Sequence, residues 1–243
     1  MKMISSGGRS TRYSRIKKFK ERGIIEYDNG KLVINYFSPY TWRVIYENRD
    51  VEYIVFRALN LANGVLTGMK IVGLVAPNPY SDIPIYEVYI SKDKAEIFAS
   101  IIGLRDDILV YSIPKSLFKS PLSKTIVLVY NLDKPVEYTS VETMYGFKIN
   151  RATMEQSLID VIRNDYWYYR GIAFEVYYYA RNYVNPEKLL ELAKLFGVKK
   201  RLITIDYVVS EVLGIKQLFN SNEELDSPLN LVRIVERLGD VLD

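Results

Sequence analysis

Basic side chains recur at regular spacing near the start of the sequence. Arg12, Arg15 and Lys18 lie three residues apart, which places them on one face of a helix. Such a row can contact backbone phosphates, and arginine can also read guanine edges. Hydroxyl groups near a helix N-terminus can add phosphate hydrogen bonds. The predicted DNA-binding residues are Ser10, Thr11, Arg12, Ser14, Arg15, Lys18 and, on a following hairpin, Lys31.

Candidates for enzymatic chemistry are few. The sequence contains no histidine and no cysteine, which excludes a Ser-His triad, thiol catalysis, disulfides and the common zinc sites. The stretch Gly7 to Thr11 lacks the spacing and the lysine of a phosphate-binding loop. The carboxylate pairs Asp106-Asp107 and Glu223-Glu224 could bind a metal, but both are expected to be solvated turns. We therefore expect no enzyme activity, no cofactor and no metal.

A helix and a hairpin are expected to position the basic row. Residues 10–22 predict the helix, which Gly23 would end in a left-handed conformation. Asn29-Gly30 between apolar runs predicts a tight hairpin turn. Together they predict the recognition helix and wing of a winged helix-turn-helix. The expected N-caps are Ser10 and Thr11, and the expected apolar face is Tyr13, Ile16 and Phe19.

Positive charge is concentrated in the same stretch. The chain has a net charge of +4, but residues 1–31 hold nine Lys/Arg against three Asp/Glu, and the remainder holds 24 against 26. A local basic patch is typical of phosphate binding, although a solvated helix face is the alternative. No signal peptide is visible, and the longest uncharged stretch, 58–69, is too short to span a bilayer. We expect a soluble, cytoplasmic protein with no membrane partner.

The remaining chain predicts an α+β fold with a helical C-terminal half. The expected domains are a winged-helix-like unit at 1–75 and an α+β domain at 76–243. Aromatic clusters at 166–170 and 177–179 could stack bases but are more typical of a core or a partner surface. Strands are expected at 85–90, 108–113, 125–130, 136–141 and 147–149, and a loop at 76–81. Helices are expected at 39–48 (or a turn), 51–62 after Asp50, 68–74 after Thr67, 92–102, 154–163 after Thr153, 172–183, 187–196 after Asn185-Pro186, 200–213 and 229–238.

Several segments of the chain resemble one known family. They are residues 149–160 with Thr153, Glu155, Leu158 and Asp160, residues 185–197, and Lys200-Arg201-Leu202 with Tyr207, Glu211 and Gly214 downstream. Residues 64–74 resemble the segment before the central strands of that family. Their order and spacing are similar to the AbiEi family of antitoxins and transcriptional regulators in abortive-infection toxin–antitoxin systems.

The resemblance implies a DNA-binding regulator that represses its own promoter and opposes a nucleotidyltransferase-like toxin. Residues expected to contact the toxin are Arg170, Lys199, Lys200 and Arg201. One departure is that only nine residues precede Ser10, where the family has two further helices. Either helices at 39–48 and 51–62 take their place, or the unit is trimmed, or the natural start lies upstream. The alternative function is a protein-interaction module with a vestigial DNA-binding domain and no nucleic-acid activity.

Overall fold

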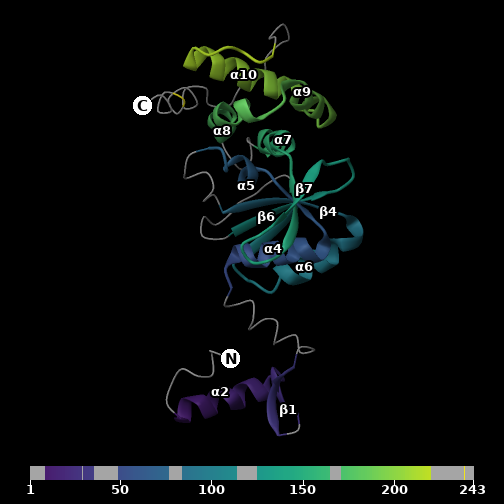
Figure 1. Cartoon of the computed structure of the whole chain (residues 1–243), viewed down its shortest axis with the longest axis vertical. Coiled ribbons are helices and arrows are strands. Elements are labelled where there is room, and N and C mark those ends of the chain that lie inside the picture. The colour runs from purple at the N-terminus through teal and green to yellow at the C-terminus, as the bar shows by residue number, and fades with distance from the viewer. Residues whose placement is uncertain are drawn as a thin grey trace.

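A computed structural model describes residues 9–28, 30–35, 49–76, 84–113, 125–164, 171–219 and 238. The fold is mixed α/β, with one large sheet, a separate hairpin and a helical C-terminal region (Figure 1). The helices are α2 (Arg9–Glu21), α4 (Val51–Ala62), α5 (Met69–Val72), α6 (Ala95–Ile102), α7 (Met154–Asn164), α8 (Ile172–Ala180), α9 (Pro186–Leu195) and α10 (Lys199–Leu213), with 3-10 turns η2 (Lys92–Lys94) and η4 (Arg181–Tyr183). The strands are β1 (Ile25–Asp28), β2 (Lys31–Ile34), β3 (Val65–Thr67), β4 (Ile85–Ile90), β5 (Ile108–Ile113), β6 (Thr125–Asn131), β7 (Tyr138–Glu142) and β8 (Lys148–Ala152).

The N-terminal elements are the expected helix and hairpin. Gly23 has φ +65°, which ends α2 in the left-handed region. The amide of Ile24 then donates to Phe19 O at 2.8 Å, and the amide of Asn35 donates to Ile24 O at 2.9 Å. Strands β1 and β2 pair antiparallel from Ile25↔Ile34 to Asp28↔Lys31. Ile24 and Ile25 are buried where the hairpin meets the helix.

Two details of the expected helix are wrong. Helix α2 already begins at Arg9, so Ser10 and Thr11 lie inside its first turn rather than at its N-cap. Tyr13 is 75% exposed, whereas Ile16 and Phe19 are half-buried. The apolar face is therefore shorter than predicted, because the hairpin reaches the end of α2 near Phe19 and leaves the turn around Tyr13 uncovered.

The large sheet has six strands in the order β5-β6-β4-β3-β8-β7. Strands β5, β6 and β4 run parallel to one another, β3 runs antiparallel to β4 and parallel to β8, and β7 closes the far edge antiparallel to β8. The strands predicted at 85–90 and 108–113 have those limits, and the other three differ by one to three residues at one or both ends. The expected range of the first domain, 1–75, thus includes β3, which is hydrogen-bonded into this sheet.

The expected helix at 68–74 is shorter, and Thr67 does not cap it. Thr67 is the last residue of β3 and is buried, while Gly68 occupies the N-cap position of α5. A strand of three residues has too little sequence for its alternation to be seen, and its pairing with β4 and β8 determines its conformation.

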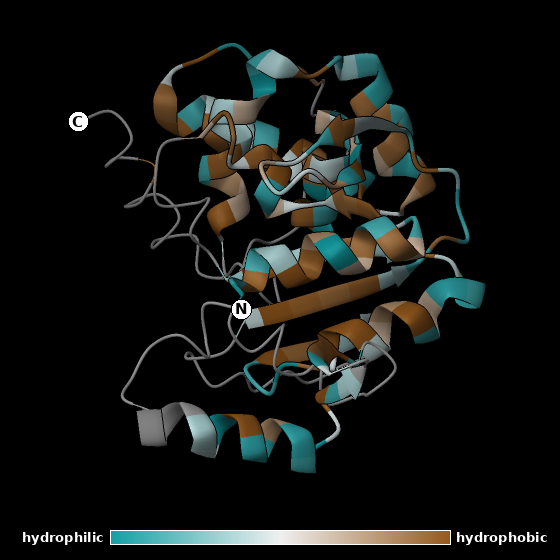
Figure 2. Cartoon of the chain, turned by 60° about the horizontal axis from the view of Figure 1, so that its bottom comes forward, coloured by the Kyte–Doolittle hydropathy of each residue, from teal (hydrophilic) through white to brown (hydrophobic). Residues whose placement is uncertain are grey.

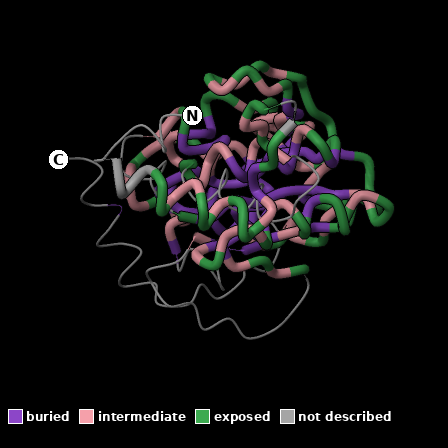
Figure 3. Tube along the Cα trace, turned by 90° about the horizontal axis from the view of Figure 1, so that it is seen from below, coloured by how far each residue is buried: buried purple, intermediate pink, exposed green. Residues whose placement is uncertain are grey.

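Helices cover both faces of the large sheet. Figure 1 shows α4 and α6 on one face, and α5 and α7 on the other with α8, α9 and α10 stacked beyond them. Helix α4 buries Ile54, Val55, Ala58 and Leu59 against the sheet. Burial of each of the three larger side chains, Ile54, Val55 and Leu59, stabilises the fold by about 1.5–3 kcal/mol. In Figure 2 the strands are largely apolar and the helices alternate apolar and polar segments, and Figure 3 shows the buried backbone running through the centre. Helix α4 is thus part of the core of the large sheet.

Helices α9 and α10 begin and end within one residue of their predicted limits, whereas the helix predicted at 172–183 ends at Ala180 and continues as the 3-10 turn η4. Asn185 accepts hydrogen bonds from the amides of Glu187 and Lys188 at 3.0 and 3.2 Å, and Pro186 is the first residue of α9. Thr153 Oγ1 accepts from the amide of Gln156 at 3.3 Å. Predictions at 39–48, 77–81, 166–170 and 229–237 lie outside the described residues. No helix in the described part of the chain is long and apolar enough to cross a membrane.

Candidate functional site

The predicted DNA-binding residues lie on α2 and at the start of β2. Ser14 and Lys18 are exposed on α2, Arg15 is half-buried, and Lys31 is exposed on the hairpin. Ser10, Thr11 and Arg12 belong to the first turn of α2, and their side chains lie outside the description. Three further cations outside this predicted set are exposed, Lys17, Lys20 and Arg22, and Arg22 follows Lys18 in the same basic row. The ammonium of Lys20 lies 5.0 Å from the ring centroid of Tyr27, which links α2 to β1.

The residues predicted to contact a partner are only partly described. Lys199, Lys200 and Arg201 form the first turn of α10, whereas Arg170 lies outside the described residues. Arg201 Nη1 donates to Ile162 O at 3.2 Å, so this turn packs beside α7. The sequence predicted no contribution from Lys134 and Arg163, yet both lie at 4.9 Å from the ring centroid of Phe196 in the turn between α9 and α10.

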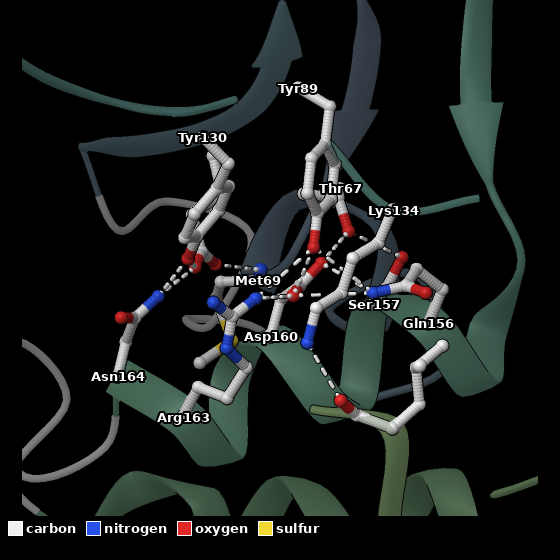
Figure 4. Close-up of polar contacts among 12 residues, drawn as sticks. Thr67, Met69, Tyr89, Tyr130, Lys134, Gln156, Ser157, Asp160, Arg163 and Asn164 are labelled. Carbon is white, nitrogen blue, oxygen red and sulfur yellow. Dashed lines mark hydrogen bonds and ion pairs between the residues drawn. The ribbon is translucent and has the colours of Figure 1, made fainter. Parts of the chain in front are cut away.

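A buried polar network that the sequence did not predict connects α7 to the sheet (Figure 4). Its centre is Asp160, which is fully buried on α7. Thr67 Oγ1 and Tyr89 Oη each donate to its carboxylate at 2.7 Å. Gln156 Nε2 lies 3.3 Å from both carboxylate oxygens, and Arg163 Nη1 donates to Oδ1 at 2.9 Å. Donors from β3, β4 and α7 therefore converge on one carboxylate.

Glu87 on β4 is the second carboxylate of the network. Tyr130 Oη donates to Glu87 Oε1 at 2.6 Å, and Asn164 at the end of α7 also donates to Oε1. The amide of Met69 donates to Oε2 at 3.1 Å, which attaches the first residue of α5 to β4. The ring centroids of Tyr89 and Tyr130 lie 4.9 Å apart. Because Tyr89 donates to Asp160 and Tyr130 donates to Glu87, the two carboxylates belong to one continuous cluster.

Burial and hydrogen bonding oppose each other in this cluster. Burial raises the pKa of Asp160, although Arg163 and the hydrogen bonds from Tyr89, Thr67 and Gln156 act to lower it. Burial also raises the pKa of Tyr89, and the adjacent Asp160 raises it further. For Arg163, burial lowers the pKa, but Asp160 and the two tyrosines raise it more, so the guanidinium stays charged.

The geometry of the network favours a structural role for its interior. A catalytic carboxylate must be reachable by a substrate, whereas Asp160 and Glu87 are both fully buried and hold several protein donors each. Within the described residues, no three His, Cys, Asp or Glu side chains are placed to share a metal ion. Asp107, one of the predicted surface carboxylates, accepts from Arg105 Nε at 2.7 Å. The solvent-facing part of the network is Arg163, whose side chain is 26% exposed.

Part of this network had a signal in the sequence. Glu87 interrupts the apolar strand 85–90, and a carboxylate inside such a strand predicts a buried partner. For Asp160 the only signal in the sequence is its place in the segment 149–160 that resembles the AbiEi family. Tyr130 and Asn164 had no signal, because their meeting depends on the sheet order rather than on local spacing.

Comparisons with protein-family models, with curated proteins and with solved structures found no match to this chain.

Proposed function

We propose that the chain is a DNA-binding transcriptional regulator of the antitoxin type, in which α2 contacts a duplex and the β1–β2 hairpin acts as the wing. The observation that carries this proposal is the exposure of Lys17, Lys18 and Lys20 on a helix that a hairpin supports. A helix backed by a hairpin is the arrangement with which winged-helix proteins reach a groove and the adjacent backbone. The family resemblance supports the same reading, with repression of its own promoter and a nucleotidyltransferase-like toxin as the partner.

The charge distribution supports phosphate contact more than base reading. Helix α2 has no acidic residue in its first turn and carries Lys18 and Lys20 in its last turn. Electrostatic contact with phosphates dominates the affinity of such proteins and depends steeply on salt. The expected roles are phosphate contacts by Lys18 and Lys31, with Arg12 and Arg15 contacting phosphates or guanine edges.

The test is binding to duplex DNA from upstream of the chain's own gene, measured by fluorescence anisotropy from roughly 50 to 200 mM salt. Replacing Arg12, Arg15 and Lys18 with alanine should weaken binding and flatten the log–log salt slope by about 2.7, at about 0.9 for each lost contact. A control with equal charge loss replaces Lys92, Lys94 and Lys148, which lie on other elements, and should keep the slope. Wild-type protein that shows no salt-dependent binding would refute the proposal and leave the protein-interaction module.

A further inference from the structure

We propose that Arg163 and Lys134 form a binding site for a phosphate group on the larger sheet domain, separate from α2. Both cations lie at 4.9 Å from the same ring, that of Phe196, although they come from α7 and from the loop after β6 (Figure 4 labels both). The inference does not depend on DNA binding by α2, because it rests on residues of the sheet domain alone.

The guanidinium of Arg163 is held in a fixed orientation. It lies 5.0 Å from the ring centroid of Tyr130 and 4.9 Å from that of Phe196, so two rings constrain it. Its Nη1 atom donates to Asp160 Oδ1 at 2.9 Å and to Tyr89 Oη at 3.2 Å. An arginine that is anchored at one nitrogen and held by rings loses little conformational entropy when it binds a ligand.

The rest of this guanidinium still has hydrogen-bond donors to offer. Within the part of the chain that the structure describes, the acceptors of Arg163 all lie at Nη1, so Nε and Nη2 donate to no protein group. The side chain is 26% exposed, which lets a ligand approach. Nε and Nη2 form the edge that binds an oxyanion with two parallel hydrogen bonds. Lys134 is exposed and uses one ammonium donor on Leu195 O, at 2.7 Å.

The surrounding charge favours phosphate as the ligand. Residues 192–205 contain four cations, Lys194, Lys199, Lys200 and Arg201, and no Asp or Glu. Of these, Arg201 donates to the carbonyl oxygen of Ile162, the residue before Arg163, so it lies close to α7. Asp160 compensates one charge of the Arg163–Lys134 pair and leaves the other. A guanidinium with a bidentate edge and a lysine at the same ring suit a phosphate, whether free, on a nucleotide or in a nucleic-acid backbone.

The test is a titration of the full chain with inorganic phosphate, adenosine monophosphate and a short single-stranded oligonucleotide. The readouts are the Nε–H resonance of Arg163 in a ¹⁵N-labelled sample and the affinity from calorimetry. Arg163→Lys keeps the charge but loses the bidentate Nε–Nη2 edge, and should weaken binding about tenfold. Lys134→Gln lies on the surface, leaves the interior intact and should weaken binding a few-fold. Lys92→Gln is the matched surface control and should bind as wild type does.

The three probes distinguish the sources of the phosphate. A site for the backbone of a nucleic acid binds the oligonucleotide more tightly than it binds inorganic phosphate. A variant with Lys17, Lys18 and Lys20 replaced by glutamine should keep the Arg163 resonance shift, which separates this site from α2. The proposal is overturned if no probe shifts that resonance, or if Lys134→Gln and a folded Arg163→Lys both bind as wild type does. It is also overturned if an oligo-aspartate peptide, but no phosphate probe, shifts the resonance.

Discussion

Replacing Gly68 with alanine tests whether the Glu87 part of the network holds α5 on the sheet. Gly68 connects β3 to α5 with φ +68° and ψ −144°, close to a region that is nearly restricted to glycine. A Cβ atom at this position would lie 1.6 Å from Glu87 Oε2 and 2.9 Å from Glu87 Cβ. The base of the Glu87 side chain cannot retreat, so its carboxylate has to leave its present position.

The cost of this displacement follows from the contacts that it breaks. The carboxylate would lose the hydrogen bonds from Met69 N at 3.1 Å and Tyr130 Oη at 2.6 Å. Each lost hydrogen bond to a charged group costs about 1.5–3 kcal/mol. Holding alanine in the backbone conformation of Gly68 costs about 1–3 kcal/mol more, so the total is about 4–9 kcal/mol. Because small domains unfold at about 5–15 kcal/mol, Gly68→Ala should be severely destabilised or unfolded.

The measurement is urea unfolding followed by circular dichroism, with Gly197→Ala as the control. Gly197 has φ +74° and no atom within 4 Å of an added Cβ, so its variant carries only the left-handed penalty of about 1–2 kcal/mol. In a Glu87→Ala background the cost of Gly68→Ala should decrease, because the carboxylate that clashes most closely is gone and only the 2.9 Å contact with the Cβ of residue 87 remains. If Gly68→Ala is no less stable than Gly197→Ala, the proposed role of the Glu87 contact is wrong.

Two further predictions concern α7 and α9. Burial raises the pKa of Asp160 in the folded state above its unfolded value. Its contribution to stability is therefore full below the unfolded pKa of about 3.9 and is lost as pH rises through the folded pKa. Urea titrations at several pH values should measure the unfolding free energy of wild type and of Asp160→Asn. The difference, wild type minus variant, should fall from acid to neutral pH. A rise would contradict the raised pKa of Asp160 in the folded state. Asn185→Ala removes the N-cap of α9 and should cost about 0.5–2 kcal/mol in thermal unfolding, with exposed Lys194→Ala nearly neutral. Equal losses in these two variants would show that the cap contributes nothing.

Local signals explain which elements the sequence predicted well. The end of α2 at Gly23, the hairpin after it and the start of α9 at Asn185-Pro186 depend on residues within a few positions of one another. A glycine with positive φ or a capping amide acts on its own turn whatever the tertiary structure is. The winged-helix assignment, the toxin partner and the domain limits stay predictions, because they depend on more than such turns.

Non-local pairing explains what the sequence could not predict. β3 has three residues and gains its conformation from β4 and β8, so the local sequence predicts Thr67 as a helix cap instead of a strand residue. Thr67 and Asp160 are 93 positions apart and meet only because β3 lies under α7. The exposure of Tyr13 is similar in origin, since the limit of the apolar face on α2 is determined by how far the hairpin reaches.

Arg163 connects the buried network with the surface, and this position explains both of its roles. Burying Asp160 without a cation would be costly, because a lone interior charge has no compensation. Arg163 supplies that cation from the rim of the network, where its side chain remains 26% exposed. A guanidinium needs only one nitrogen for the interior carboxylate, so its other edge is available to a ligand without breaking the ion pair. The contact that stabilises α7 on the sheet therefore also fixes the orientation of the proposed phosphate site.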